Sequence, residues 1–453
     1  MLEYIELFDG AIRGRLIFLI INCLFILHFI YFWYVGYKRY GWKMDFWTLI
    51  TGRFFLVHIF IMFPFNGSLR NRLSLVDSEI NQVQQYLELA YIISVIGYIS
   101  IYIGRALYSS RHTYLDALFK PISRVIEKNI KTPLAVNLLS IISLLLLAVV
   151  IYFQVKTNNI LAPRTFFQAN GFWRPFYNAC LTLFPLTILF VGLNCLNKGG
   201  FFRWCYFAVL VVLSVFLGTR MATLEPLLLL FFFYCIKNNA KINLRKIVIV
   251  ATLFIYSTIL LLSFRSNEVK RQYSNNEINA ILYGNTFSDT RDLAYLIANW
   301  DKELLWGKTY TAGLISFIPR QFSEHREKWA LGIFTARITN YDNKTFPGFR
   351  PGFFGEAYFN FSFAGVILLG IITGYLLRYI DLKIKNIIVK KDDVIQSYAV
   401  SIPWFIIGAL SISIGFTTFY IFLVITIAIG FIRQLISYFN LLIFKAGVRS
   451  NQE

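Results

Sequence analysis

Charged residues are scarce in this chain, and their scarcity excludes an ordinary soluble protein. Only 15% of the 453 residues are Asp, Glu, Lys or Arg, whereas soluble domains contain about 25%. Hydrophobic residues make up 57% of the chain, and the mean hydropathy is +0.58. Apolar runs of about twenty residues recur along the sequence, and most are long enough to cross a bilayer. These features predict an integral membrane protein.

Cysteine and histidine are also rare. The five cysteines all lie within or at the edge of apolar runs, which argues against a disulfide framework and against a metal cluster. The four histidines form no His-x-x-x-His pair, and no Cys-x-x-Cys is present. We therefore expect neither a metal nor a cofactor.

Two further absences bear on the class of membrane protein. No internal repeat is visible at a fixed period, which weakens the interpretation as an inverted-repeat transporter. No Ala-x-Ala cleavage site follows the first apolar run. We therefore expect this run to be a retained anchor and not a signal peptide.

The apolar runs predict an all-α polytopic membrane protein with about eleven transmembrane helices. The first eight lie in residues 1–264, and the last three lie in 356–453 together with a cytoplasmic tail. A large helical outer loop over 265–355 separates the two sets. The expected spans are 16–36, 45–65, 86–104, 133–154, 175–195, 204–218, 222–236, 247–264, 356–377, 395–415 and 417–440.

The orientation follows from the distribution of Lys and Arg, because basic residues stay on the cytoplasmic side. One alternate set of loops and the carboxyl-terminal tail hold 22 of them, against 8 in the opposite short segments. This asymmetry places 265–355 outside and the carboxyl terminus inside, and it also accounts for a net charge of +20 without a nucleic-acid partner. The amino terminus is then outside, unless an interfacial helix lies near Leu2 to Phe8.

The outer segment 265–355 is the longest departure from the apolar pattern. It contains Trp300, Trp306 and Trp329 and short apolar runs, a composition that disordered segments lack. We expect short interfacial helices, for instance near 276–301 and 308–318. Such a segment indicates a chamber beside the membrane for a polar, anionic substrate.

Four arginines are candidates for binding that substrate. Arg220 lies between two spans, after Gly218 and before Pro226, where an arginine beside helix-terminal N–H groups can hold a diphosphate. Arg265 closes the eighth span, Arg291 opens a short helical run, and Arg320 follows a proline. Planar guanidinium groups grip phosphate oxygens bidentately. The alternatives are a snorkelling Arg220, or one paired with Glu225, and solvated loop charges for the others.

Two residues are candidates for general acid–base catalysis. Glu356 lies where the outer segment re-enters the membrane and is suited to act as a base or to orient a sugar hydroxyl. It is equally suited to stabilise the start of the ninth span through the helix dipole. His325 has a suitable unperturbed pKa, and its alternative is an ordinary loop histidine.

Four stretches within about 210–375 form a recognisable set: Gly218-Thr219-Arg220, Asp289-Thr290-Arg291-Asp292, Gly307-Lys308-Thr309-Tyr310 with a later Pro319-Arg320, and Gly355-Glu356-Ala357-Tyr358-Phe359-Asn360-Phe361. In these stretches the chain resembles the Wzy-type O-antigen polymerases, which polymerise oligosaccharide repeat units. Arg337 and Gly348 also fit an Arg-x10-Gly spacing associated with some of these polymerases. The chain departs from the family at Gln321-Phe322-Ser323-Glu324, where members often have Trp and Lys-Pro.

The resemblance implies a glycosyltransferase of the bacterial inner (plasma) membrane that acts in lipopolysaccharide or other surface polysaccharide biosynthesis. It would polymerise undecaprenyl-diphosphate-linked oligosaccharides by a reaction that needs no metal. Its other partners would be the membrane lipids around it and a chain-length-determining co-polymerase. Arg220, Arg265, Arg291 and Arg320 would bind the diphosphates, with Arg220 and Arg320 acting in catalysis, and Glu356 or His325 would activate the acceptor hydroxyl.

Three alternatives stay open. An O-antigen ligase shares the lipid donor and the large outer loop but transfers to a different acceptor. A lipid-linked oligosaccharide flippase would be expected to show related halves and short outer loops. A metal-dependent glycosyltransferase would need an acidic motif in its first outer loop, and 66–85 offers only Asp77-Ser78-Glu79.

Overall fold

In the part of the chain that it describes, every regular element of the computed structural model is a helix. It describes residues 16–40, 45–61, 77–109, 133–157, 166–167, 172–218, 226–227, 229–231, 234, 289–315, 318, 322–341, 348–390, 400–401, 404–405 and 408. Its elements are α2 (Leu16–Tyr40), α3 (Phe46–Ile61), α5 (Asp77–Leu107), α7 (Pro133–Lys156), α9 (Arg174–Lys198), α10 (Phe201–Leu213), the 3-10 helix η1 (Ser214–Leu217), α15 (Asp289–Ala298), α16 (Lys308–Leu314), α17 (Glu324–Trp329), α18 (Leu331–Ile338) and α19 (Gly352–Lys390).

Four helices in the described residues are long and apolar enough to cross a membrane: Gln85–Leu107, Asn137–Lys156, Phe176–Leu196 and Gly352–Ile388. Ile20–Val35 and Phe201–Leu217 are shorter apolar helices. The helical membrane protein predicted from composition is therefore confirmed. The count of eleven spans stays a prediction, because 247–264 and 417–440 lie outside the described residues and 222–236 and 395–415 are described only in part.

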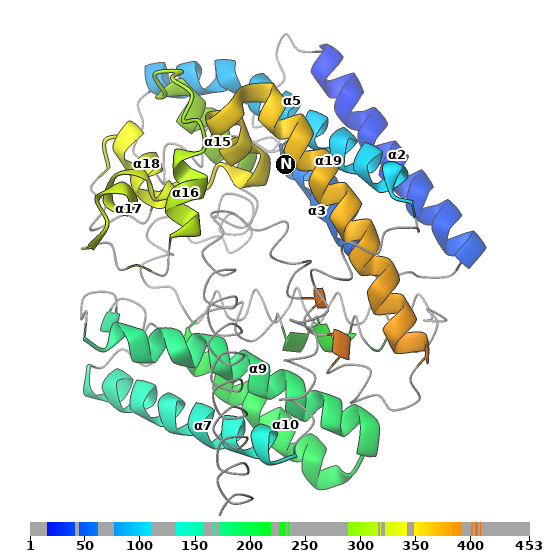
Figure 1. Cartoon of the computed structure of the whole chain (residues 1–453), viewed down its shortest axis with the longest axis vertical. Coiled ribbons are helices and arrows are strands. Elements are labelled where there is room, and N and C mark those ends of the chain that lie inside the picture. The colour runs from blue at the N-terminus through cyan, green and yellow to red at the C-terminus, as the bar shows by residue number, and fades with distance from the viewer. Residues whose placement is uncertain are drawn as a thin grey trace, which may run out of the picture. The chain divides into compact units, whose positions relative to one another are not determined.

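The chain divides into two compact units, and the division falls within α5 after Tyr91 and within α19 after Ile380. The first unit contains α7, α9 and α10, with η1, packed as neighbours (Figure 1). Their core is almost wholly apolar and includes Phe167, whose ring stacks on Tyr177 with centroids 4.8 Å apart. Inside it, the hydroxyl oxygens of Ser143 and Thr187 lie 2.8 Å apart, which satisfies two polar groups among apolar neighbours.

The end of η1 bears on one predicted site residue. Gly218 ends this element in the left-handed conformation, with φ 65° and ψ 12°, which residues other than glycine adopt with difficulty. The Tyr177 hydroxyl donates a hydrogen bond to the Leu217 carbonyl at 2.8 Å and so holds this end. The helix therefore ends at Gly218, the last residue of the predicted span 204–218, and Arg220 lies outside the described residues.

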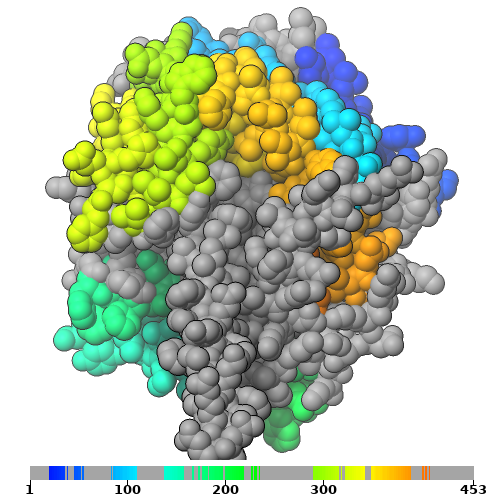
Figure 2. All heavy atoms as spheres, in the orientation of Figure 1, coloured from blue at the N-terminus to red at the C-terminus, as the bar shows by residue number. Residues whose placement is uncertain are grey.

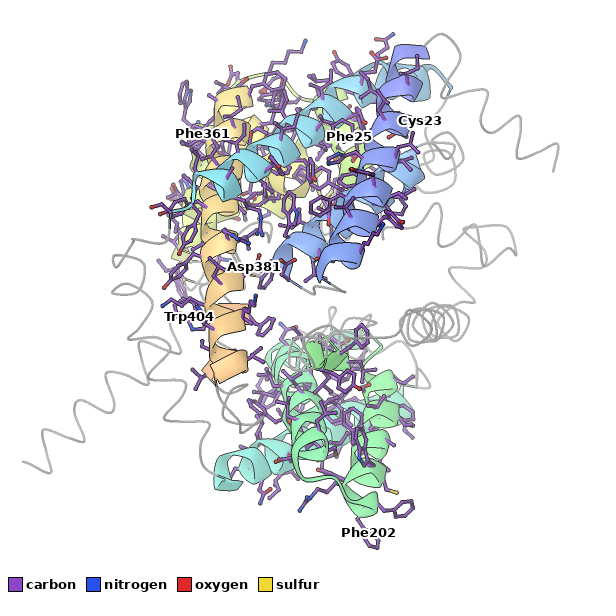
Figure 3. All side chains as sticks on the ribbon, turned by 90° about the vertical axis from the view of Figure 1, so that its right-hand side faces the viewer. Cys23, Phe25, Phe202, Phe361, Asp381 and Trp404 are labelled. Carbon is purple, nitrogen blue, oxygen red and sulfur yellow. The ribbon has the colours of Figure 1, made fainter. Side chains whose placement is uncertain are left out.

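The first unit also contains α2 and α3, which pack against each other through aromatic rings such as Trp33 and Phe55, 5.0 Å apart. The beginning of α3 is capped twice. The Asp45 carboxylate accepts a hydrogen bond from the Thr48 N–H, and the buried Asp381 carboxylate accepts one from the Phe46 N–H, both at 2.8 Å. Asp381 lies on the last part of α19 (Figure 3). Carboxylates at a helix N-terminus satisfy free N–H groups and stabilise the helix dipole.

In the second unit, α5 and α19 cross in direct backbone contact (Figures 1 and 3). A Cβ atom on Gly104 would lie 2.1 Å from the Ile371 carbonyl oxygen, and one on Gly374 would lie 2.1 Å from the Ile101 carbonyl oxygen. Small residues permit this approach between membrane helices, where van der Waals packing drives association. The two helices therefore form the frame that carries the outer elements of this unit.

The described part of the outer segment is packed and helical, as its composition predicts. α15 and α16 lie within the helices predicted near 276–301 and 308–318, of which 276–288 and 316–317 lie outside the described residues. The helices α16, α17 and α18 are mutual neighbours, and the Phe334 ring of α18 packs edge-on to Phe359 of α19 at 5.7 Å. The segment around these three helices (lime to yellow in Figure 2) lies at the surface on the face shown.

Candidate functional site

A buried polar network joins the first turn of α16 to α19. The Thr309 hydroxyl donates a hydrogen bond to Glu356 Oε1 at 3.0 Å, and it accepts one from Asn360 Nδ2 at 2.7 Å. Asn360 Nδ2 also donates to the Glu356 carbonyl oxygen at 2.8 Å. The exposed fractions of Thr309, Glu356 and Asn360 are 1%, 2% and 0%. One hydroxyl therefore binds a carboxylate and an amide that are otherwise shut off from water.

The backbone reinforces this network. The N–H groups of Leu305 and Trp306 donate to the carbonyl oxygens of Phe359 and Asn360, both at 3.0 Å. In a regular helix those carbonyls accept from the N–H groups four residues later. Here α19 departs from helical geometry at Phe361 and at Ser362, which has φ 57° and ψ −153°. The break frees the carbonyls for the loop before α16 (Phe361 is labelled in Figure 3).

The conformation of Ser362 is strained, because almost only glycine adopts that region of φ and ψ, at a cost of about 1–3 kcal/mol for other residues. The break also has a geometric consequence. A straight helix of 39 residues would be about 58 Å long, whereas the hydrocarbon core of a bilayer is about 30 Å thick. The first part of α19, which carries Glu356 and Asn360, is thus separated from the apolar part that follows Ser362.

Aromatic side chains surround the network. The Tyr310 ring lies nearly parallel to that of Phe361, with centroids 6.3 Å apart, and Trp306 lies edge-on to Phe361. Trp306 is 72% exposed and has a positive φ of 48°. Burial, and after it the nearby Glu356 charge, raise the pKa of the Tyr310 hydroxyl above its ordinary value. Tyr310 therefore stays protonated at neutral pH.

One polar atom of the network has no partner in the described chain. Asn360 Oδ1 is buried and accepts no hydrogen bond from any described group. Because buried polar atoms are nearly always paired, such an acceptor indicates a position for an ordered water or for a hydroxyl group of a ligand.

His325 contacts the same turn of α16. Its Nε2 is 3.0 Å from the Lys308 carbonyl oxygen. A carbonyl accepts and does not donate, so Nε2 carries the proton in this contact and neutral His325 has Nδ1 as its basic nitrogen. Ser323 caps α17 by accepting a hydrogen bond from the Arg326 N–H at 3.3 Å. This cap fixes the start of the helix that presents His325.

The structure places some of the predicted site residues and does not describe others. Glu356 and His325 approach the same turn of α16, through Thr309 and Lys308 respectively. Arg291 lies on α15 and is only 7% exposed, next to the equally buried Asp292, and both residues take part in contacts. A buried guanidinium requires compensating partners. Arg220, Arg265 and Arg320 lie outside the described residues.

The position of Glu356 along its helix corrects one expectation. The helix begins at Gly352 and not at 356, so Glu356 lies in its second turn. The positive end of a helix dipole acts mainly within the first turn. The carboxylate accepts a hydrogen bond from the Thr309 hydroxyl.

Sequence reasoning quoted Thr309 and Asn360 only as parts of motifs and assigned them no role. The spacing of Glu356 and Asn360, four residues apart, could have shown that both lie on one face of a helix. No local signal pairs either of them with Thr309. Among the described residues, no group of three His, Cys, Asp or Glu side chains is placed to hold a metal ion.

Gly348, the glycine of the Arg-x10-Gly spacing, lies against α18. It has φ 92°, and a Cβ atom on it would lie 2.2 Å from the Gly332 carbonyl oxygen. The following N–H, of Phe349, donates to the Thr335 hydroxyl at 3.1 Å. The returning chain therefore packs directly against α18, the helix that carries Arg337.

Comparisons with known proteins identify no relative of this chain: no family model, no curated protein and no solved structure matches it.

Proposed function

We propose that this protein is a glycan polymerase at the outer face of a bacterial inner membrane. It transfers a growing chain from undecaprenyl diphosphate to a fresh lipid-linked repeat unit. The observation that carries the proposal is the Thr309–Glu356–Asn360 network. Two stretches that resemble the Wzy-type polymerases, Gly307 to Tyr310 and Gly355 to Phe361, meet in it although they lie far apart in the sequence.

The apolar helices support a membrane-embedded enzyme. The packed aromatic and basic segment around α16, α17 and α18 supports a chamber for a polar substrate. In the proposed reaction the acceptor hydroxyl oxygen bonds to the anomeric carbon as the bond from that carbon to the diphosphate oxygen breaks. The lipid diphosphate leaves with the electron pair. Arg220, Arg265 and Arg320, with Arg291 in support, stabilise the charge that develops on it, so the step requires no metal.

The hydroxyl proton needs an acceptor. Glu356 is buried and bonded to Thr309, so its proposed role is to hold the first turn of α16 and to orient the groups around it. His325 has its Nε2 at the Lys308 carbonyl, and its Nδ1 is the basic nitrogen that takes the proton. A base of this kind contributes typically 10²–10⁴-fold to a rate.

The test is a surface-polysaccharide gel from cells lacking this protein. The cells are restored with wild type, with Arg220→Ala, or with Arg350→Ala as a control that removes an exposed arginine to which no role is assigned. We expect the deletion to leave lipid A core capped by a single repeat unit. Wild type and Arg350→Ala restore the ladder, and Arg220→Ala, at equal protein level, does not.

Other outcomes separate the alternatives. Bare core without any repeat unit would point to a ligase or a flippase, because both act before or at attachment. An unchanged ladder in the deletion would remove the proposal. A full ladder with Arg220→Ala would remove that arginine from the mechanism but leave the polymerase itself in place.

A further inference from the structure

Three cationic side chains gather around one indole ring in the outer segment. The Nζ atoms of Lys308 and Lys328 lie 4.5 Å and 5.5 Å from the centroid of the Trp329 ring, and Cζ of Arg337 lies 4.8 Å from it. Arg337 also lies 5.9 Å from the Phe334 ring centroid. The cations come from α16, α17 and α18, and all three side chains are exposed. We call Lys308, Lys328, Trp329 and Arg337 the Trp329 cluster.

The three cations of this cluster contact an aromatic ring and, in the described residues, form no ion pair. Because each cation lies within 5.5 Å of one centroid, no two of them are more than about 10 Å apart, a distance close to the Debye length of about 8 Å in physiological salt. Within the described ranges of the chain, none of the three forms an ion pair; their partner is the aromatic face. A cation–π contact holds a cation without neutralising it. The positive charge of the cluster therefore stays available to an anion.

The cluster is held in a defined geometry. His325 on α17 contacts the Lys308 carbonyl of α16, and α17 and α18 are joined through the single residue Ala330. The close approach of Gly348 to Gly332 and Thr335 fixes α18 from its other side. The three helices that carry Lys308, Lys328 and Arg337 are thus packed together, so the positions of these side chains relative to one another are defined.

The chemistry of the side chains selects the anion. Arg337 presents a planar fork suited to two oxygens of one group, and the two lysines are compact charges that approach from other helices. A phosphate group offers several strong acceptor oxygens, and a diphosphate carries enough charge to meet three cations. A single carboxylate is planar and carries one charge, so it leaves most of the cluster unpaired.

We propose that the Trp329 cluster is a binding site for a phosphate or diphosphate group. The group comes either from the headgroup of an anionic phospholipid or from a lipid-linked diphosphate. The proposal does not rest on the proposed function, because it concerns binding and requires no glycosyl transfer.

The test uses the full-length protein in nanodiscs of phosphatidylcholine and inorganic pyrophosphate as the probe, measured by titration calorimetry. Lys308→Gln with Arg337→Gln removes two charges from the cluster. Arg350→Gln with Lys385→Gln removes two exposed charges elsewhere and is the matched control. We expect wild type and control to bind pyrophosphate alike and the cluster variant to lose one binding event per chain, or at least tenfold in affinity.

Arg337→Lys keeps the charge and removes the planar fork, so it is expected to bind with intermediate affinity. An equal thermal unfolding midpoint for all variants shows that the fold is retained. A diphosphate site elsewhere in the chain, such as one at Arg220, would persist in the cluster variant. Equal binding by the cluster variant and the control, no binding by wild type, or equal binding of the carboxylate glucuronate would overturn the proposal.

A second arm identifies the source of the phosphate. Wild type is titrated again in nanodiscs that contain phosphatidylglycerol in place of phosphatidylcholine. Loss of the cluster's binding event there means that the phospholipid headgroup occupies the site. Its persistence means that the site prefers a diphosphate, such as that of a lipid-linked substrate.

Discussion

One hydroxyl group makes a hydrogen bond to each of two buried polar side chains. Thr309 donates to Glu356 and accepts from Asn360, and all three residues are nearly inaccessible to water. A buried group that loses its partner costs more free energy than a hydrogen bond contributes, because its desolvation is no longer compensated. The hydroxyl therefore matters beyond the two bonds it makes.

We predict that Thr309→Val lowers the free energy of unfolding by about 1–3 kcal/mol, because it leaves a carboxylate and an amide without that partner. Thr309→Ser keeps the hydroxyl and should retain most of the stability. The measurement is the thermal unfolding midpoint in detergent. The control is Thr311→Val on the same helix, where the exposed hydroxyl bonds only to the Gly307 carbonyl. Equal midpoints for Thr309→Val and Thr311→Val would contradict the prediction.

At the scale of elements, the crossing of α5 and α19 depends on glycines that face backbone atoms. Gly104 faces the Ile371 carbonyl and Gly374 faces the Ile101 carbonyl, so each helix contributes a glycine and a backbone surface. A backbone cannot move aside as the end of a flexible side chain can. The crossing distance is thus set by the absence of two Cβ atoms.

We predict that Gly104→Ala or Gly374→Ala forces the helices apart and destabilises the protein by about 1–3 kcal/mol, the usual cost of overpacking. The matched control is Gly52→Ala in α3, because a Cβ atom there would meet nothing within 4 Å. Thermal unfolding in detergent compares the three variants. Midpoints for the crossing variants as high as that of Gly52→Ala would show that the crossing tolerates a methyl group.

For the whole molecule, the predicted topology places the outer segment 265–355 outside and the loop 237–246, between the predicted spans 222–236 and 247–264, inside. We predict that alkaline phosphatase is active when fused after Phe322 and inactive when fused after Asn239, because the enzyme folds only outside the cytoplasm. Green fluorescent protein at the same positions should give the reverse pattern. Activity after Asn239 would invert the orientation derived from the basic residues.

The apolar pattern predicts the helices well and their contacts poorly. The predicted span 175–195 corresponds to α9, which begins at Arg174 and ends at Lys198, because the ends of long apolar runs are local properties. α19 extends beyond its predicted span 356–377 at both ends, because helical hydrogen bonding continues where hydrophobicity stops.

The candidate site was only partly predictable, because the sequence shows residue types but not contacts between distant residues. Glu356 and His325 were named from their residue types and positions, but their convergence on α16 depends on contacts distant in sequence. Neither Phe361 nor Ser362 is a proline or glycine, so the sequence did not predict the helix break at these positions. The Trp329 cluster draws its cations from three helices, so no single stretch of sequence displays it.

The pairing of the loop before α16 with α19 has a consequence for how related chains can differ in length. Residues 305–309 meet residues 356–360 through two backbone and two side-chain hydrogen bonds. An insertion or deletion inside either block would shift this register, so that the hydroxyl of Thr309 and the carboxylate of Glu356 no longer coincide. Surface segments between the blocks can lengthen at an entropic cost that rises only slowly. Gene lineages that keep this site should therefore vary in length between the two blocks and hardly at all within them.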